Sequence, residues 1–241
     1  MRSHVRLVLA VLLLTTVPLL RAQTAADPSG HWEGGVQAPS GDIKVEIDLA
    51  KNDKGVFAGT FSNVAEGLKG LPLATVAVEG KTVTLELRAG SGGGTFRGEL
   101  STDGKSLSGN FILAEGGQSI PFSLTRAGDA RMPSAPKSAA IGKQFEGTWN
   151  GTLTVGDKQM RLVLKMANQP DGTAAGTIFS MDGSRIEIPI AMTQTASNMT
   201  VEVASVGGKY VAGLNAEGTE LAGMWTQGKT VLPLTMRREA K

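Results

Sequence analysis

Residues 42–49 read Asp-Ile-Lys-Val-Glu-Ile-Asp-Leu, so that every second side chain is apolar. Successive side chains of a β-strand point to opposite faces, and a period of two therefore predicts a strand that is buried on one face only. The same alternation returns in three further segments, 83–87, 160–166 and 199–203. No part of the chain after residue 22 shows a sustained helical period. The sequence thus predicts an all-β protein with few helices.

Turn signals and a long internal repeat indicate how these strands are connected and divided into domains. Gly30-His31-Trp32-Glu33-Gly34 is matched 117 residues later by Gly147-Thr148-Trp149-Asn150-Gly151, and the offset then falls to 114 and finally to 112. Asp-Gly and Glu-Gly pairs recur every ten residues or so, as hairpins between antiparallel strands require. We expect two domains of about eight strands each, at 30–126 and 147–238. Residues 127–144, with Pro133 and Pro136, are the expected linker.

Two architectures fit eight short antiparallel strands. Closure into a β-barrel removes exposed edges and is the favoured prediction. Four prolines fall inside strand-like runs, where proline is at home only at edges and bulges: Pro72, Pro121, Pro189 and Pro233. They keep a pair of β-sandwiches open as the alternative.

The first 22 residues have the pattern of a signal peptide. A basic start with Arg2 and Arg6 precedes an apolar run from Leu7 to Leu20, which is too short to span a bilayer, and Ala22 or Ala25 offers a cleavage site. We expect export to the periplasm or the medium of a bacterium, with no membrane span after removal of this segment. The chain has no cysteine, which excludes disulfides and thiolate chemistry.

The charge balance excludes one class of partner. The whole chain carries a net charge of +2, but Arg2, Arg6 and Arg21 lie in the predicted signal segment. Without them 21 basic residues stand against 22 acidic ones. The sequence therefore gives no electrostatic case for nucleic-acid binding.

Residues for catalysis and metal binding are scarce. His31 is the one histidine after the signal segment, so a Ser-His-Asp triad is not expected, and zinc-type ligand spacing is absent. His31 itself is expected to be a solvated residue at the start of a strand. We predict no catalytic residues, no metal site and no cofactor, hence a protein that is not an enzyme.

A Gly-x-Trp on the first strand and an arginine ending the last one resemble the calycin superfamily, which includes the lipocalins. In that family the arginine packs over the tryptophan and closes one end of the barrel. The resemblance implies that Trp32 pairs with Arg126 and Trp149 with Arg238. Strand parity agrees, since Arg126 continues the apolar series Ile120, Phe122, Leu124.

A second resemblance spans nearly all of each repeat. The order Gly147 to Gly151, Asp171-Gly172, Ile188-Pro189-Ile190 and Gly223 to Leu234 is similar to a β-rich domain that precedes the α/β-hydrolase domain of some exported bacterial esterase-like proteins. That family usually has Ser-x-Asp-Gln-Gly before the Ile-Pro step, whereas this chain has Ser180-Met181-Asp182-Gly183. The hydrolase domain itself is missing, so the resemblance implies an accessory module without hydrolase activity.

Aromatic residues recur at equivalent places in both repeats. Phe96 and Phe111 in the first correspond to Tyr210 and Trp225 in the second. An eight-stranded barrel is either filled by side chains or just wide enough for one small molecule, so these residues either form the core or line a ligand. Trp225 and Gln227 are the better ligand candidates, and the second repeat is the expected binding copy.

Three functions remain open from the sequence. The favoured one is a non-catalytic, exported binding or interaction module with an unknown protein partner. The alternative is a carrier of a small apolar ligand inside one or both barrels. A hydrolase-associated or weak enzymatic role is the third.

Overall fold

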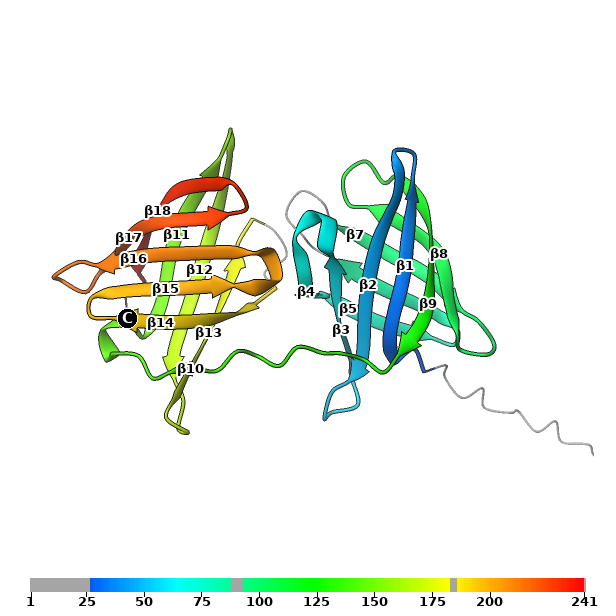
Figure 1. The fold of residues 1–241 in the computed structure, drawn as a ribbon, viewed down its shortest axis with the longest axis horizontal. Helices are drawn as coiled ribbons and strands as arrows, with labels where there is room; N and C mark the ends of the chain where they lie inside the picture. The colour runs from blue at the N-terminus through cyan, green and yellow to red at the C-terminus, as the bar shows by residue number, and fades with distance from the viewer. Residues whose placement is uncertain (1–26, 88–92, 183–185, 241) are drawn as a thin grey trace, which may run out of the picture.

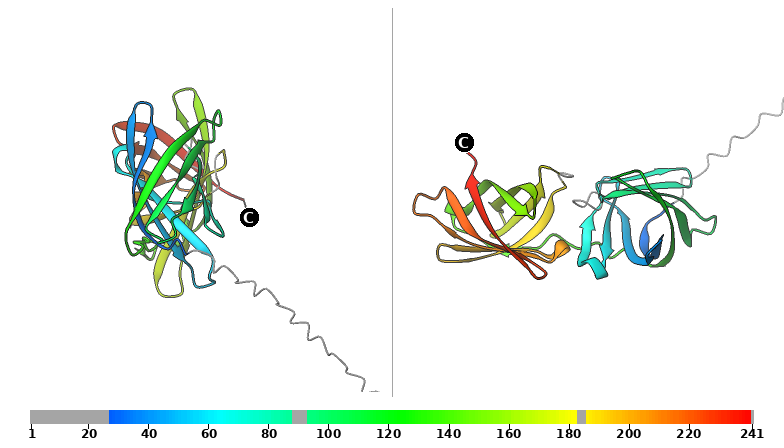
Figure 2. Two further views of the ribbon diagram at one scale, coloured as in Figure 1. Left: turned by 90° about the vertical axis from the view of Figure 1, so that its right-hand side faces the viewer. Right: turned by 90° about the horizontal axis from the view of Figure 1, so that it is seen from above.

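The computed structural model describes residues 27–87, 93–182 and 186–240. Two antiparallel β-sheets, one from each repeat, curl into two barrel-like units that lie side by side (Figure 1 and Figure 2). The helical elements within these ranges are three single turns, η1 (Val64–Glu66), η2 (Lys143–Phe145) and η3 (Ala204–Val206). The predicted all-β class with two barrel-like units is confirmed. The predicted signal peptide lies outside the described residues.

The second unit is a closed eight-stranded barrel. Its strands pair in chain order, and the ring closes where Trp149 lies opposite Arg238. A two-residue strand, β10 (Ser138–Ala139), pairs with the start of β13. The barrel strands are β11 (Gly147–Val155), β12 (Lys158–Asn168), β13 (Thr173–Ser180), β14 (Ile188–Thr195), β15 (Asn198–Val203), β16 (Gly208–Leu214), β17 (Glu220–Gln227) and β18 (Thr230–Arg238).

The first unit is a curled nine-stranded sheet. Its order is β4-β3-β2-β1-β9-β8-β7-β6-β5, so the two end strands are consecutive in the chain and occupy the place of the single strand β14 in the second unit. Leu73 N–H donates to the Gly59 carbonyl (2.9 Å) and Ala74 N–H to the Glu86 carbonyl (2.8 Å), so the connection between them touches both β3 and β6. The strands are β1 (Gly30–Ala38), β2 (Gly41–Lys51), β3 (Phe57–Asn63), β4 (Leu68–Pro72), β5 (Thr75–Glu79), β6 (Thr82–Leu87), β7 (Gly94–Leu100), β8 (Ser106–Leu113) and β9 (Ser119–Gly128).

The alternation of the sequence becomes an inner and an outer face. In β2 the side chains of Val45, Ile47 and Leu49 are buried, whereas Ile43, nearest the hairpin, is 40% exposed. Each unit encloses its own hydrophobic cluster, and Ile188 and Val206 of the second unit also pack against the cluster of the first. Each barrel interior is therefore built from the residues that the period of two selects.

The prolines do not turn the barrels into sandwiches. Pro121 lies beyond the last pair between β9 and β1, which is Phe122 opposite Val36. Pro233 likewise lies beyond the pairs of β18 with β11, which end at Met236. A residue without an N–H is tolerated there because no ladder bond to that neighbour is required.

The connection between the units differs from the expected linker of residues 127–144. Strand β9 continues to Gly128, so the first sheet reaches two residues into this range. At the other end β10 and η2 already belong to the second unit, where Ile141 and Phe145 are buried in its core. The segment outside both sheets is thus residues 129–137. It is not a free tether, because Arg131 N–H donates to Asp48 on the outer face of β2 (2.7 Å).

Candidate functional site

Each unit carries an arginine stacked over a tryptophan at one end. The Arg126 guanidinium carbon lies 4.6 Å from the Trp32 ring centroid, and that of Arg238 lies 4.2 Å from the Trp149 ring centroid. Both indoles are fully buried, and each donates its Nε1–H to a carbonyl four residues upstream, at 2.9 and 3.0 Å. This is the contact that strand parity and the calycin resemblance predict.

The two guanidinium groups also make the same set of hydrogen bonds. Arg238 donates from Nε to the Gly218 carbonyl (2.9 Å) and from its two terminal nitrogens to the carbonyls of Glu146 and Gln144. Arg126 makes the equivalent three bonds in the first unit, to the carbonyls of Gly104, Ser29 and Asp27. Each arginine therefore ties the chain before the first strand to the turn that precedes the penultimate strand. This is a structural role.

Replacing Arg238 tests that role. Arg238→Met keeps the apolar stem but removes three charged hydrogen bonds and the cation–π contact, so we expect a loss of about 1–3 kcal/mol in the free energy of unfolding. Urea denaturation followed by tryptophan fluorescence measures it. Arg237→Met is the matched control, because the Arg237 side chain is 79% exposed and forms an ion pair with Glu220 (3.3 Å) instead of stacking on a tryptophan. Equal losses in the two variants would contradict the closing role.

The aromatic residues of the first unit lie in its core. Phe96 is 1% exposed, and its ring centroid lies 4.3 Å from that of Phe111, 5.2 Å from that of Phe122 and 5.9 Å from that of Phe61. Such spacings are those of directly packed rings. Of the two interpretations left open by the sequence, Phe96 and Phe111 fit core packing.

The corresponding residues of the second unit are also packed. Tyr210 lies opposite Trp225 across β16 and β17, and its hydroxyl contacts the buried carbonyls of Leu221 (2.7 Å) and Leu234 (3.1 Å). Burial raises the pKa of this hydroxyl. Gln227 is exposed at the rim, where it accepts from the Trp225 indole N–H (3.3 Å) and donates to the Val206 carbonyl. Trp225 and Gln227 thus hold η3 against the barrel.

A groove of about 720 Å³ lies on the outer face of the first unit. Its floor is the paired segment of β1 and β2 around Gly34 and Gly35, and η1 contributes Val64 and Ala65 to one wall. Val64 is 74% exposed, which is unusual for a large apolar side chain. Gly35 has no side chain on this face, so that a ligand could reach the backbone there, whereas the Cβ position of Gly34 is directed at Ser123 and Leu124.

The groove is acidic. Among its lining residues are three carboxylates, Glu33, Asp42 and Glu46, against one ammonium group, Lys44. Glu33 lies directly opposite Glu46 in the register of β1 and β2. Like charges at directly opposed positions repel each other, and a cation bound beside them would reduce that repulsion. The arrangement is suited to a positively charged ligand.

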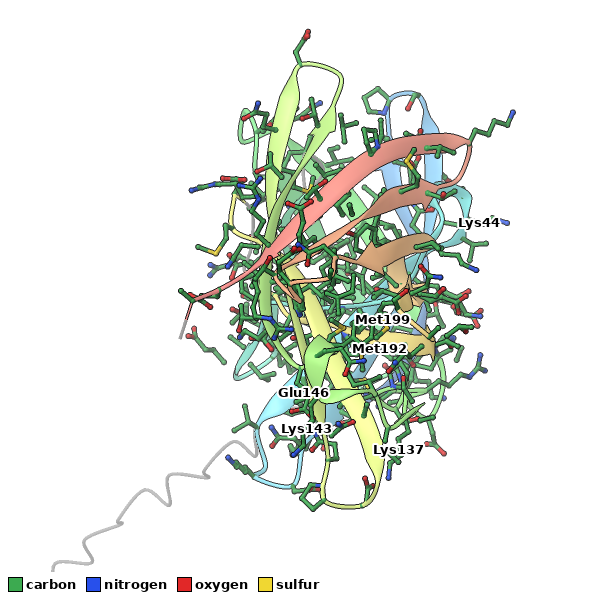
Figure 3. All side chains as sticks on the ribbon, turned by 90° about the vertical axis from the view of Figure 1, so that its left-hand side faces the viewer. Lys44, Lys137, Lys143, Glu146, Met192 and Met199 are labelled. Atoms are coloured by element: carbon green, nitrogen blue, oxygen red, sulfur yellow. The ribbon has the colours of Figure 1, made fainter. Side chains whose placement is uncertain are left out.

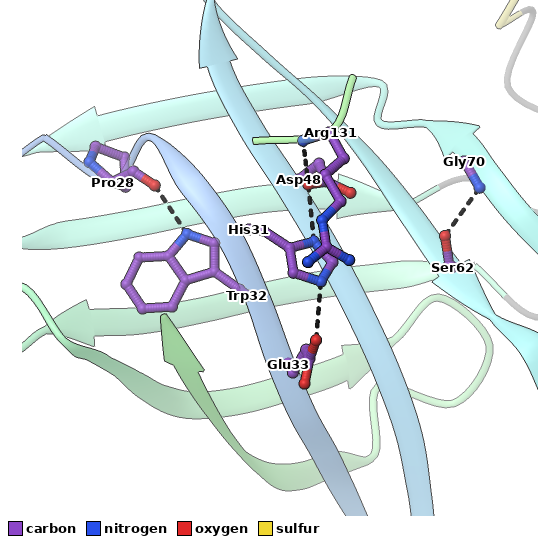
Figure 4. Close-up of polar contacts among 8 residues, drawn as sticks. All are labelled: Pro28, His31, Trp32, Glu33, Asp48, Ser62, Gly70 and Arg131. Carbon is purple, nitrogen blue, oxygen red and sulfur yellow. Dashed lines mark hydrogen bonds and ion pairs between the residues drawn. The ribbon is translucent and has the colours of Figure 1, made fainter. Parts of the chain in front are cut away.

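The interpretation of His31 as a solvated residue was wrong. His31 is 1% exposed, because the connection after β9 passes over its ring (Figure 4). Its Nδ1 lies 2.8 Å from Asp48 Oδ1, and its Nε2 lies 3.1 Å from Glu33 Oε1. The same Asp48 oxygen accepts the backbone N–H of Arg131. The burial arises from residues 100 positions away in sequence, which strand periodicity does not reveal.

The histidine joins the groove to the linker. One of its carboxylate partners, Glu33, lines the groove, while the other, Asp48, is held under residues 129–137. A neutral imidazole donates from one nitrogen only, whereas the protonated ring donates to both carboxylates. In a catalytic triad, the histidine Nε2 takes the proton from the nucleophile. In His31 this atom is already engaged by the Glu33 carboxylate.

The groove was not among the predicted sites, and it lies on the first unit rather than the expected second one. The repeat accounts for this difference. At an offset of 117 residues, Glu33, Asp42, Lys44 and Glu46 correspond to Asn150, Gln159, Arg161 and Val163. The second copy therefore has no carboxylate at any of these positions. Comparing the outward residues of the two copies, rather than the inward ones, would have found the signal.

Neither a metal-binding cluster nor a membrane-spanning helix is found in the part of the chain that the structure describes. No group of three or more His, Asp or Glu side chains there could hold a metal ion. Across residues 27–87, 93–182 and 186–240, no helix has both the length and the apolar character needed to cross a bilayer.

Comparisons with known proteins give no family. No protein family model matches the chain, and no curated protein matches it. Among solved structures, a candidate outer membrane protein of Bacteroides fragilis is 14% identical with a TM-score of 0.31, over 88% of this chain and 97% of that one. A DUF3598-family protein of unknown function from Nostoc punctiforme is 12% identical with a TM-score of 0.26, over 88% and 96%. Neither likeness is close enough to bear on function.

Proposed function

We propose that this protein is an exported, non-catalytic binding module whose first unit recognises a positively charged segment of a protein partner. The observation that carries the proposal is the groove with Glu33 opposite Glu46 on its floor. Export rests on the predicted signal peptide, and places the partner in the periplasm or outside the cell. The absence of catalysis rests on the engagement of His31 Nε2 by Glu33.

The carrier alternative is less favoured by the same structure. The four aromatic residues that could have lined a ligand are all 8% exposed or less and pack within the two hydrophobic clusters. Native mass spectrometry of the mature protein separates the two functions. We expect a bare protein mass, whereas an extra mass that is lost on denaturation would favour a carrier.

Charge reversal of the ligand and neutralisation of the groove test the binding proposal. We expect a fluorescent tetralysine peptide to bind the wild-type chain and to lose at least tenfold in affinity in the double variant Glu33→Gln, Glu46→Gln. Affinity should also fall as salt rises, because exposed charges are screened. Fluorescence anisotropy at two ionic strengths measures both effects, with tetraglutamate as the peptide control.

The matched control variant is Glu202→Gln. Glu202 is also a strand glutamate with an exposed side chain, and it lies in the second unit beside Lys209. We expect this variant to bind tetralysine like the wild-type chain. Equal affinities in all three proteins, or equal binding of tetraglutamate, would refute the groove as the site.

A further inference from the structure

Strand β10 fills a gap between two barrel strands in the second unit. Ser138 and Ala139 pair with Ala174 and Thr173 at the start of β13. On its other side, Ser138 Oγ accepts the backbone N–H of Met192 on β14 (2.8 Å). Ala174 is 0% exposed and Met192 is 5% exposed, so two residues are enough to cover this place. Figure 3 labels Met192 together with Lys137, the residue before β10.

The residues after β10 hold it in position. Asn168 accepts the Ile141 N–H at Oδ1 (2.9 Å) and donates from Nδ2 to the Ile141 carbonyl (2.8 Å). Gln194 Oε1 accepts the Gly142 N–H (2.6 Å). The Ile141 side chain is buried in the barrel core. The second unit is thus completed by a short extended segment that precedes its first barrel strand.

The repeat identifies the corresponding place in the first unit. At an offset of 117 residues, Thr173–Ala174 corresponds to Val56–Phe57. Val76 pairs with Leu85 as Met192 pairs with Val201, so Val76 is the counterpart of Met192. We call the region between Val56–Ala58 and Thr75–Ala77 the β3–β5 seam. The counterpart of β10 is Arg21–Ala22, which lies within the predicted signal peptide and outside the described residues. Cleavage after the predicted signal peptide would remove these two residues from the mature chain.

The β3–β5 seam is more exposed than its counterpart. Val56 is 58% exposed, and Phe57 and Val76 are only partly buried. In the second unit the residues equivalent to Phe57 and Val76 are both buried. The Lys51 ammonium lies 4.9 Å from the Phe57 ring centroid, but Val56 stays open to solvent. An apolar side chain beside an exposed strand edge is typical of a place where another chain adds a strand.

The directions of the backbone amides at the seam support the same interpretation. Leu73 N–H is directed toward β3, where it donates to Gly59, and Ala74 N–H is directed toward β6. Thr75 pairs with Glu86, and because the β5–β6 hairpin closes over two residues at Glu79–Thr82, the Thr75 amide also points to β6. Alternate residues of an extended strand direct their polar groups to opposite neighbours. Val76 is the next residue of β5, so its amide faces the seam, as the Met192 amide does in the second unit. By the same alternation Phe57 on β3 directs its amide and carbonyl to the seam, because Gly59 does so two residues on.

We infer that the β3–β5 seam accepts an extended segment of a partner protein as an added β-strand, antiparallel to β3, in the manner of β10 in the second unit. Main-chain hydrogen bonds supply the affinity in this mode of recognition, and alternate side chains supply the specificity. The segment that fits has a small hydroxyl residue opposite Phe57, next to the Val76 amide, and an apolar residue three positions later, as Ser138 and Ile141 show. This site is separate from the groove and does not depend on it.

Disulfide trapping tests the seam, because the chain contains no cysteine. The protein is Val56→Cys, and the probe is a peptide of residues 137–145 with Cys in place of Ala139, the residue that pairs with the equivalent Thr173. Val231→Cys is the control, since Val231 is 55% exposed on the hairpin of β17 and β18. In a glutathione buffer we expect at least tenfold more mixed disulfide with Val56→Cys than with Val231→Cys, and no such excess with the reversed peptide sequence.

A second measurement uses the chain without substitutions. Saturation with the Ser138-containing peptide of residues 137–145 should slow hydrogen exchange at least tenfold at the Phe57 and Val76 amides, which face the seam, and leave β14 unchanged. Equal trapping at both cysteines would overturn the inference. So would strong protection of the Val76 amide before any peptide is added, because the seam would then be filled by the chain itself. Glu33→Gln with Glu46→Gln should leave trapping unchanged, so the groove and the seam are tested independently.

Discussion

Trp149→Ala is expected to lower the free energy of unfolding of the second unit by about 3–5 kcal/mol, the usual cost of removing a large buried aromatic side chain. Trp149 is 0% exposed and lies in the core beneath Arg238. Its loss opens a cavity, leaves the Phe145 carbonyl without the indole donor and removes the surface on which the guanidinium rests. Urea denaturation measures the loss. Hydrogen exchange should localise it to residues 147–238.

Trp149→Phe is the control for this prediction. It keeps an aromatic ring beneath Arg238 but loses the indole N–H and part of the volume, so we expect a smaller cost than for alanine. The exchange rates of residues 30–87 should be unchanged in both variants, because Trp32 forms the equivalent contact within the first unit. A loss below about 1 kcal/mol for Trp149→Ala would show that the barrel end is closed by other contacts.

The inward side of this fold could be predicted from sequence, because each inward residue is selected by a local period of two. Val45, Ile47 and Leu49 follow directly from that period, and all three are buried. The pairing of arginine with tryptophan also follows, since it depends on strand parity and on the repeat. What periodicity did not give is the division of one barrel strand into β4 and β5, which falls at the connection through Leu73 and Ala74.

The outward side was harder to predict for a physical reason. An outward residue is solvated only if no other segment of the chain packs over it. His31 and Asp48 are covered by residues 129–137, a segment whose composition is typical of a linker. The groove arises in the same way, from the position of η1 beside the outer face of β1 and β2. Long-range coverage leaves no local pattern, so the acidic pair Glu33 and Glu46 looked like two solvated charges.

The second large effect on stability is expected at Gly223, where the backbones of two strands approach each other closely. Gly223 on β17 lies opposite Ala212 on β16, and a Cβ built on it would lie 2.6 Å from the Ala212 Cα and closer still to the Val211 carbonyl oxygen. Both obstacles are backbone atoms, which cannot rotate away. Gly223→Ala should therefore force β16 and β17 apart and cost about 3 kcal/mol or more, at the upper end of overpacking substitutions. Gly109 is in the same situation in the first unit, against Arg97 and Gly98.

Gly213→Ala separates this steric effect from the general cost of replacing a strand glycine. Gly213 lies on the same strand pair, but its Cβ would meet only the Asn198 side-chain oxygen at 3.3 Å, an atom that can move. Alanine there restricts the unfolded chain and should be neutral or stabilising by about 0.5 kcal/mol. Urea denaturation of both variants, with hydrogen exchange across β16 and β17, measures the difference. Similar stabilities for Gly223→Ala and Gly213→Ala would show that the two strands can separate without cost, and that the glycine is not required by close packing.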